Sequence, residues 1–549
     1  MKTTQRQRNR ISWMRLAGNS AMLAFAAVML SAVITSESVQ AQTFTTVHSF
    51  DDTDGYGPYA GLVQATDGNL YGTTAFYGAN DYGTVFKITP GGTLTTLHSF
   101  EGTDGEYPYS GLVQASDGNF YGTTQSGGAN GDGTIFKITS SGTLTTVHSF
   151  DGTDGSSPQG GLVQASNGTL YGTTYGGGAN GDGTVFKITL SGTLTTLHSF
   201  DGTDGGNPLA GLVQATNADL YGTTALLGAN GDGTVFKITP SGTLTTLHSF
   251  GGTDGISPYA GLIQASDGNL YGTTPGGGAN GDGTVFKITL SGTLTTQHSF
   301  DGTDGFEAQA GLVQASDGNL YGTTYWGGAN NHGTVFEITL GGTLTTLHSF
   351  DITDGSNPNA GLVQDTNGVL YGTTYDGGAN GDGTVFSVSV SLSPFVVLRS
   401  TSGKEGAKVG ILGQGFSSSS VVEFGGVAAT TIALTGSTYI SATVPAGALT
   451  GSVTVTTGAT TLSSSQTFKV LPAITSIPAS GAVGTPVAIT GTGLTQTTKV
   501  TFGGVKATSF TVNNDMQVTA TVPTGAKTGK IAVTTTGGSA SSKTSFTVD

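Results

Sequence analysis

The sequence contains no cysteine, and only 10% of its 549 residues are charged. Without cysteine there is no disulfide, so stability must come from buried side chains and backbone pairing. Lysine and arginine are scarce, at 19 residues against 35 acidic ones, and residues 42–390 hold only five lysines. This acidic balance argues against nucleic acid and anionic lipid as partners, and it favours neutral ligands or cations.

Long hydrophobic runs are absent except near the N-terminus. There, an apolar run from Ala21 to Ile34 follows five basic residues and precedes Val39-Gln40-Ala41, which is a small-x-small cleavage pattern. The order predicts a signal peptide over residues 1–41. A membrane anchor is the weaker alternative, because the run is shorter than the ~20 residues that a span needs. We therefore expect an exported protein, secreted or periplasmic, with cell-surface association left open.

Catalytic motifs are missing as well. There is no G-x-S-x-G, no phosphate-binding loop and no cysteine nucleophile, and the few carboxylates that differ between repeats form no recognisable pair of the kind glycosidases use. The sequence therefore predicts a protein that is not an enzyme. The alternative is a glycan-active hydrolase or lyase whose active site is assembled from distant repeats.

Glycine, in contrast, is abundant, at 92 residues, and most of these glycines recur at fixed places in a fifty-residue repeat. His-Ser-Phe occurs seven times from His48 to His348, and Tyr-Gly-Thr-Thr occurs seven times from Tyr71 to Tyr371, with no insertion or deletion. One unit reads as four strands: Gly161–Ala165, Thr169–Thr174, Thr184–Thr189 and Thr193–Phe200. Four short strands per fifty residues is typical of a β-propeller blade.

The repeat array begins and stops in the middle of a unit. Residues 42–50 match only the fourth strand, and residues 361–390 supply only the first three. Seven complete units result only if the N-terminal strand joins the last three, which also removes two exposed sheet edges. We therefore predict a seven-bladed β-propeller over residues 42–390.

A second period, of 78 residues, covers the remainder. Gly413-Gln414-Gly415-Phe416 matches Gly491-Thr492-Gly493-Leu494, and Phe424-Gly425-Gly426-Val427 matches Phe502-Gly503-Gly504-Val505. Short β-rich runs broken by Gly, Pro and Ser are typical of a small Ig-like sandwich. The whole chain is predicted to be all-β, with Ig-like domains at 391–471 and 472–549.

These blocks resemble known families. The G-x-G-F, V-x-F-G-G and V-P-x-G blocks of both copies resemble the IPT/TIG family of Ig-like domains. The fifty-residue unit, with Leu-Tyr-Gly-Thr-Thr and Gly-Thr-Val-Phe-Lys-Ile, is similar to the GloVer tandem repeat of exported bacterial proteins. The resemblance implies extracytoplasmic location and repeat architecture but no activity. Domains of the IPT/TIG family bind DNA, serve as receptor ectodomains or act as spacers. Because the chain is expected to be exported and these two domains hold only nine basic residues, we expect a spacer or adhesion role.

Seven of the eight histidines share one strand position, so we predict a structural role in hydrogen bonding rather than catalysis. The Thr-Asp-Gly aspartates, from Asp54 to Asp354, are predicted to form turns. Calcium is the weaker alternative for a second set of aspartates in Ala-Asn-Gly-Asp-Gly, because the EF-hand spacing is missing. No cofactor or metal is predicted. That second set is Asp132, Asp182, Asp232, Asp282 and Asp382.

Differences between the repeats gather in the connection into each unit and in the loop between its second and third strands. Both lie at the same end of a four-stranded antiparallel blade, so one aromatic-rich face is predicted to bind a glycan or cell-surface ligand, with the Ig-like domains as a stalk. A purely structural envelope protein is the alternative. The sixth unit departs most from the others, and its predicted site is Phe306, Glu307, Tyr325, Trp326, Asn331 and His332. The second candidate, in the first unit, is Tyr56, Tyr59, Phe76, Tyr77 and Tyr82.

Overall fold

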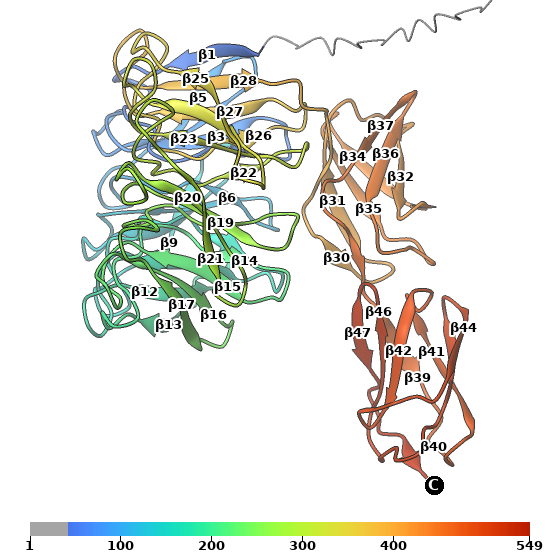
Figure 1. Cartoon of the computed structure of the whole chain (residues 1–549). Helices are drawn as coiled ribbons and strands as arrows, with labels where there is room; N and C mark the ends of the chain where they lie inside the picture. The colour runs from blue at the N-terminus through green and yellow to red at the C-terminus, as the bar shows by residue number, and fades with distance from the viewer. Residues whose placement is uncertain (1–41) are drawn as a thin grey trace, which may run out of the picture. The chain divides into compact units, whose positions relative to one another are not determined.

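The computed structural model of the chain describes residues 42–549, and every regular element in that range is a β-strand (Figure 1). The predicted signal peptide lies outside the described residues. Among residues 42–549 there is no helix with the length and apolar character that a membrane crossing requires. The all-β prediction is therefore confirmed for the described part of the chain.

Each fifty-residue repeat folds into a four-stranded antiparallel sheet, and there are seven such sheets in residues 42–390. The first strands are β2 (Val63–Gln64), β6 (Val113–Gln114), β10 (Val163–Gln164), β14 (Val213–Gln214), β18 (Ile263–Gln264), β22 (Val313–Gln314) and β26 (Val363–Gln364). The second strands are β3 (Leu70–Thr74), β7 (Phe120–Thr124), β11 (Leu170–Thr174), β15 (Leu220–Thr224), β19 (Leu270–Thr274), β23 (Leu320–Thr324) and β27 (Leu370–Thr374).

The third strands are β4 (Thr84–Ile88), β8 (Thr134–Ile138), β12 (Thr184–Ile188), β16 (Thr234–Ile238), β20 (Thr284–Ile288), β24 (Thr334–Ile338) and β28 (Thr384–Ser389). The fourth strands are β5 (Leu94–Ser99), β9 (Leu144–Ser149), β13 (Leu194–Ser199), β17 (Leu244–Ser249), β21 (Leu294–Ser299), β25 (Leu344–Ser349) and, for the seventh sheet, β1 (Thr43–Ser49). The strand order within a repeat is sequential, as in β10-β11-β12-β13.

The first strand of each repeat is shorter than predicted. The run Gly161–Ala165 was expected to form a whole strand, but only Val163 and Gln164 pair with β11. The chain turns back early because the backbone N–H of Ala165 donates to the carbonyl of Thr169 (2.9 Å) and closes the Ser-Asn-Gly turn. The residues before Val163 are left to line the centre of the repeat array.

The hydrophobic core lies between consecutive sheets. Tyr171, Val185 and Phe200 of the third repeat pack with Leu212, Leu220 and Phe236 of the fourth, and all are buried. The glycine inside the second strand belongs to this packing. A Cβ on Gly172 would lie 2.6 Å from Phe186 Cζ and 2.8 Å from Leu162 Cδ2, so a larger residue would collide with the core.

The seventh repeat contacts the first as each repeat contacts the next. Strand β1 pairs antiparallel with β28, from Thr43 opposite Ser389 to Ser49 opposite Thr384. The backbone N–H of Thr66 donates to Gln114 Oε1 of the following repeat (3.1 Å), and that of Thr366 donates to Gln64 Oε1 of the first (3.0 Å). The repeats therefore have a β-propeller-like fold of four-stranded antiparallel blades.

The remaining residues form two β-sandwiches of the same topology. The first has sheets β29-β31-β35-β34 and β33-β32-β36-β37, and the second has β39-β41-β45-β44 and β43-β42-β46-β47. The strands of the first are β29 (Val397–Leu398), β30 (Ser402–Gly403), β31 (Lys408–Leu412), β32 (Val421–Phe424), β33 (Val427–Ala428), β34 (Ile432–Thr435), β35 (Tyr439–Thr443), β36 (Val453–Thr457), β37 (Thr460–Ser463) and β38 (Lys469–Val470).

The strands of the second are β39 (Ala473–Ser476), β40 (Ser480–Gly481), β41 (Pro486–Thr492), β42 (Thr497–Phe502), β43 (Val505–Lys506), β44 (Phe510–Asn514), β45 (Gln517–Thr521), β46 (Ile531–Thr535), β47 (Gly538–Ser541) and β48 (Thr547–Val548). Each sandwich has its own core, in which Phe424 contacts Phe468 and Phe502 contacts Phe546 edge to face. The two Phe-Gly-Gly-Val blocks thus begin equivalent core positions, which explains the period of 78.

Candidate functional site

The connection into each repeat pairs with the loop between its second and third strands. One antiparallel backbone bridge joins the two segments in each of the seven repeats, for example Tyr56 with Phe76 in the first and Phe306 with Trp326 in the sixth. The predicted placement of the two variable segments at one end of the strands is therefore confirmed. We call this end of the repeats the variable face.

In the sixth repeat the structure brings four of the six predicted residues into direct contact. Phe306 and Trp326 exchange backbone hydrogen bonds of 2.9 and 3.0 Å, and the N–H of Tyr325 donates to the carbonyl of Glu307 (3.0 Å). The Tyr325 and Trp326 rings are perpendicular, with centroids 5.2 Å apart. Their side chains are half-buried, and the Glu307 carboxylate accepts from Gln309 Nε2 at 3.0 Å.

The other two predicted residues have separate local roles. Asn331 takes a left-handed backbone conformation (φ 61°) at the place where five repeats have a positive-φ glycine, and its Oδ1 accepts from the N–H of Gly327 (3.2 Å). Asparagine tolerates this conformation better than most residues, which explains the substitution. His332 faces the seventh repeat, where its Nδ1 lies 3.3 Å from Ser356 Oγ.

The second candidate is the centre of a larger aromatic cluster. The Tyr56 ring contacts Phe76, Tyr77 and Tyr375, at centroid distances of 5.9, 5.4 and 5.3 Å. Tyr59 contacts Tyr109 at 4.8 Å, and Phe76 and Tyr82 contact Tyr107 at 5.5 and 6.3 Å. The cluster thus extends from the seventh repeat through the first to the second. Its members are Tyr56, Tyr59, Phe76, Tyr77, Tyr82, Tyr107, Tyr109 and Tyr375.

Hydrogen bonding and burial hold this cluster in place. The hydroxyl of Tyr56 donates to Asp376 Oδ1 at 2.7 Å, and burial together with that bond raises the pKa of Tyr56. Burial raises the pKa of Tyr325 to about 12, and the nearby Asp376, Tyr375 and Tyr59 contribute to the increase. Tyr77 is the most open ring, 41% exposed.

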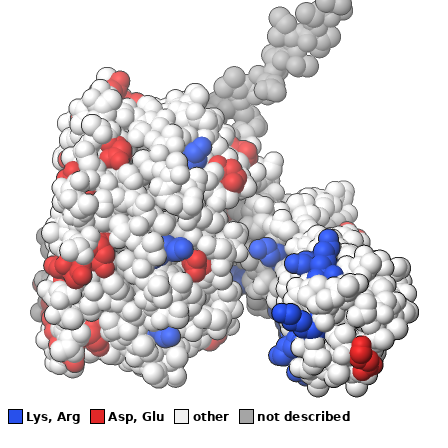
Figure 2. All heavy atoms as spheres, turned by 60° about the horizontal axis from the view of Figure 1, so that its bottom comes forward, with Lys and Arg blue, Asp and Glu red and all other residues white. Residues whose placement is uncertain are grey.

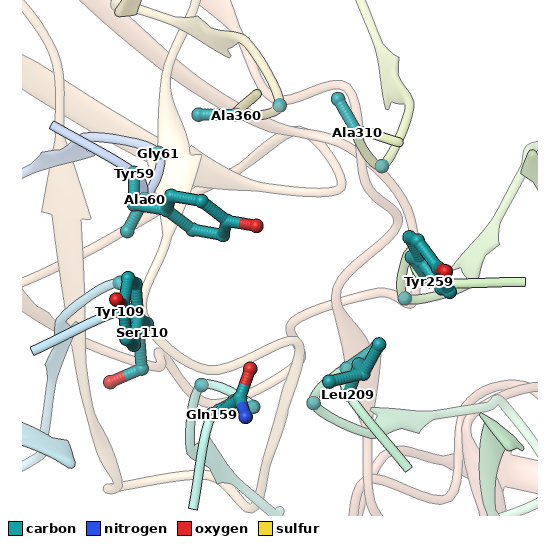
Figure 3. Close-up of a pocket in the computed structure, with 18 of the residues that line it drawn as sticks. Tyr59, Ala60, Gly61, Tyr109, Ser110, Gln159, Leu209, Tyr259, Ala310 and Ala360 are labelled. Carbon is teal, nitrogen blue, oxygen red and sulfur yellow. The ribbon is translucent and has the colours of Figure 1, made fainter. Parts of the chain in front are cut away.

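Sequence reasoning missed the main cavity of the repeats. It has a volume of about 440 Å³ and is lined by the short segments that lead into the first strands, as Figure 3 shows. One variable position contributes a side chain from every repeat, tyrosine in three, glutamine in two, and leucine and asparagine in one each, between the proline or alanine of the connection and the small residue before Gly-Leu. The residues at this position are Tyr59, Tyr109, Gln159, Leu209, Tyr259, Gln309 and Asn359.

The cavity lining is polar and uncharged. None of its lining residues is Asp, Glu, Lys, Arg or His. Burial raises the pKa of Tyr59, and the neighbouring Asn359 amide opposes that rise. Among the side chains of residues 42–549, Asn359 Oδ1 is the one buried polar atom without a hydrogen-bond partner, and Asn359 is only 9% exposed.

The repeat histidines lie away from this cavity in identical pairs. Each Nε2 is 2.6–2.8 Å from the Oδ2 of the aspartate six residues later, as in His198 with Asp204. The predicted hydrogen bonding is confirmed, but the partner is the following connection rather than a neighbouring strand or blade. In five repeats the Asx turn is formed instead by an aspartate three residues earlier, as where Asp201 Oδ1 accepts from the N–H of Thr203 at 3.0 Å.

No part of residues 42–549 gathers three or more His, Cys, Asp or Glu side chains that could hold a metal ion. The aspartates considered as possible calcium ligands form hydrogen bonds through their backbone carbonyls. The carbonyl of Asp182, for example, accepts from the N–H of Asn207 at 2.8 Å. Figure 2 shows acidic side chains spread over the repeats, and most of the lysines and arginines on the Ig-like domains. Within residues 42–390 the basic side chains are limited to five lysines.

Comparison with known proteins identifies both repeat types. Residues 31–226, 154–316 and 213–428 match the family described as the Gloeobacter/Verrucomicrobia repeat, and residues 388–470 and 472–548 match the IPT/TIG domain. No curated protein matches the chain.

Similar solved structures include a gluconolactonase of Xanthomonas campestris, which is 12% identical with a TM-score of 0.36 over 64% of this chain and 90% of that one. A fungal alcohol oxidase of the AA5 family, in complex with copper, is 13% identical with a TM-score of 0.43 over 92% of this chain and 99% of that one. SGBP-B from a xyloglucan utilization locus in Bacteroides uniformis is 23% identical with a TM-score of 0.14 over 27% of this chain and 46% of that one. None of these similarities is strong enough to assign an activity.

Proposed function

The chain belongs to the Gloeobacter/Verrucomicrobia repeat family, and we propose that it is an exported, non-enzymatic binding protein whose variable face recognises a neutral glycan of a cell surface or polysaccharide. The two IPT/TIG domains, which are typical of extracellular proteins, serve as its stalk. Cleavage of residues 1–41 would release the mature protein outside the cytoplasm. The protein has no cofactor in this proposal.

The scaffold of this function is a closed, seven-bladed propeller. The pairing of β1 with β28 supports closure, as does the hydrogen bond from Thr366 to Gln64, which repeats the contact made between every other pair of neighbours. A closed ring fixes all seven connections around one axis without a free sheet edge. Loops on so rigid a support can vary in sequence while keeping their positions.

The observation that carries the proposal is the collection of the variable segments, with their aromatic rings, at one end of the repeats. Aromatic side chains present large, rigid contact surfaces, and tyrosine adds a hydrogen-bonding hydroxyl. The eight-ring cluster around Tyr56 and the Tyr325–Trp326 pair flank the seventh repeat from its two sides. We treat them as two ends of one binding surface. The uncharged cavity lining, which holds no acid–base pair, supports a binding rather than a catalytic role.

The test is binding of the mature protein to an array of neutral plant, fungal and bacterial polysaccharides. Two double variants, Tyr56→Ala with Tyr77→Ala and Tyr325→Ala with Trp326→Ala, should each weaken binding by about 5- to 150-fold, since each removes two ring contacts of about 0.5–1.5 kcal/mol. The matched control is Leu226→Ala, which removes an exposed apolar side chain from the equivalent loop of the fourth repeat and should change binding less than twofold.

Thermal unfolding of each variant separates lost contacts from lost folding. Retention of full binding by both folded double variants would contradict the assigned surface. A parent protein that binds no neutral polysaccharide would contradict the glycan proposal as a whole.

A further inference from the structure

We propose that the cavity lined by Tyr59 and Asn359 is a subsite for the terminal ring of a neutral sugar, which would enter it end-on from the variable face. This inference rests on the proposed function and deepens it, because the aromatic surface would bind the internal sugar residues of the glycan while the cavity recognises its terminal residue. The cavity volume of about 440 Å³ lies within the ~300–1,000 Å³ range of small-molecule sites and is too small for a folded partner.

Charge selects the class of ligand. The lining has tyrosine hydroxyls, side-chain amides, one serine and backbone groups, but no ionised side chain. A charged ligand group would lose its hydration there without meeting an opposite charge. A neutral hydroxylated ligand loses less, and each of its hydroxyls can both donate and accept.

The pair Tyr59 and Asn359 supplies the specific contact. The Asn359 side chain neighbours Tyr59, and its Oδ1 is buried without a hydrogen-bond partner. Figure 3 shows the Tyr59 hydroxyl directed toward the centre of the cavity. A donor and an acceptor side by side match two adjacent hydroxyls of a sugar, one accepting from Tyr59 and the other donating to Asn359. The ligand would thus satisfy the buried acceptor that the protein leaves unpaired.

The other repeats line the cavity with two kinds of side chain, aromatic and amide. Tyr59 and Tyr109 stand edge to face on one side, and Tyr259 lies across the cavity from Tyr59. Aromatic walls suit the apolar faces of a sugar ring, while Gln159 and Gln309 add hydrogen-bonding groups between them. Gln309 is also bonded to Glu307, so the cavity is connected to the sixth-repeat end of the binding surface.

The experiment uses calorimetric titration of the mature protein with methyl glucoside, methyl galactoside, methyl mannoside and methyl xyloside, and with methyl glucuronide as the charged analogue. At least one neutral glycoside should bind, and the glucuronide should bind at least tenfold more weakly. Tyr59→Phe and Asn359→Leu should each weaken the neutral glycoside about tenfold, because each removes one hydrogen bond to it. Leu226→Ala, outside the cavity, is the control.

A second measurement needs no ligand. Asn359→Leu removes a buried unpaired acceptor, so the melting temperature of the ligand-free variant should equal or exceed that of the parent. A fall of several degrees would mean that Asn359 serves the fold and would overturn its assignment to the ligand. Tighter binding of the glucuronide than of every neutral glycoside would also overturn the proposal.

The two proposals fail in different ways. If the parent binds a polysaccharide and the cavity variants bind it and the methyl glycosides as well as the parent does, the surface proposal stands and the cavity subsite is wrong. If the parent binds neither polysaccharide nor glycoside, both are wrong.

Discussion

At the residue scale, the histidine–aspartate pair explains why His-Ser-Phe and Thr-Asp-Gly always occur together. In the second repeat, His98 Nε2 lies 2.7 Å from Asp104 Oδ2, and Asp104 Oδ1 accepts from the N–H of Glu101 at 2.9 Å. One carboxylate therefore fixes both the end of the outer strand and the connection that follows. The sequence predicted that the histidine is structural, but its partner depends on how the chain turns after Phe100, which no residue pattern specifies.

This pair predicts a pH-dependent stability. Burial alone would raise the pKa of Asp104, but the hydrogen bonds from His98 and the Glu101 N–H outweigh it, and the pKa lies below its ordinary value of 3.8. A carboxyl whose pKa is lowered by folding stabilises the protein above its unfolded pKa, and that contribution is lost as the pH falls through the folded value. Asp104→Asn should therefore cost about 1 kcal/mol at pH 7 and almost nothing near pH 2.

Urea unfolding of parent and variant at pH 7, 5, 4, 3 and 2 measures this difference. Thr139→Ala, a turn residue of the same repeat whose hydroxyl bonds are neutral, is the control and should show a difference that does not change with pH. A cost of Asp104→Asn that stays constant from pH 7 to pH 2 would contradict the role given to the carboxylate.

At the element scale, the packing between neighbouring sheets determines which residues the second strand accepts. Gly72 in β3 is not in the left-handed region; it is there because a Cβ would lie 2.6 Å from Phe86 Cζ and 2.8 Å from Leu62 Cδ2. We expect Gly72→Ala to destabilise the protein by about 1–3 kcal/mol, the usual cost of overfilling a core. Gly91→Ala is the control, because the nearest atom to its added Cβ would be 3.9 Å away. Equal melting temperatures of the two variants would contradict this explanation.

The elements were the most predictable level of the structure. Period, turn residues and alternation located all four strands of each repeat, since these signals are local. The shortening of the first strand to Val163–Gln164 was not predictable, because it depends on the turn made by Ala165 and on the open centre before Gly161. Asn331 was placed in a binding site because it breaks the repeat, whereas its left-handed φ gives the substitution a backbone reason.

At the scale of the whole molecule, the cavity exists only because seven segments fifty residues apart face one axis. Its signal is present in the sequence, as one variable position between a proline that six repeats share and a small residue in all seven, from Tyr59 to Asn359. It could not be interpreted from one unit, because no unit alone encloses a space. The unpaired Oδ1 of Asn359 likewise appears only once the repeats are assembled. The proposed function therefore depends on how the repeats are arranged around the cavity more than on any single repeat.

Closure itself predicts the effect of removing β1. The Phe44 ring stacks on His348 at 3.7 Å and contacts Phe386 at 5.5 Å, so this strand joins the seventh repeat to the sixth as well as completing its own sheet. Deleting residues 42–50 should expose the edge of β28 and open the core around Phe386. We expect a melting temperature lower by more than 10 °C, or aggregation through the free edge. Phe44→Leu is the control, because leucine occupies this place in the other six fourth strands and should be tolerated.

A synthetic peptide of residues 42–50, added to the deleted protein, should restore part of the lost stability by pairing with β28, and the increase should depend on peptide concentration. A deleted protein that melts at the parent temperature and stays monomeric would show that the N-terminal strand does not close the ring.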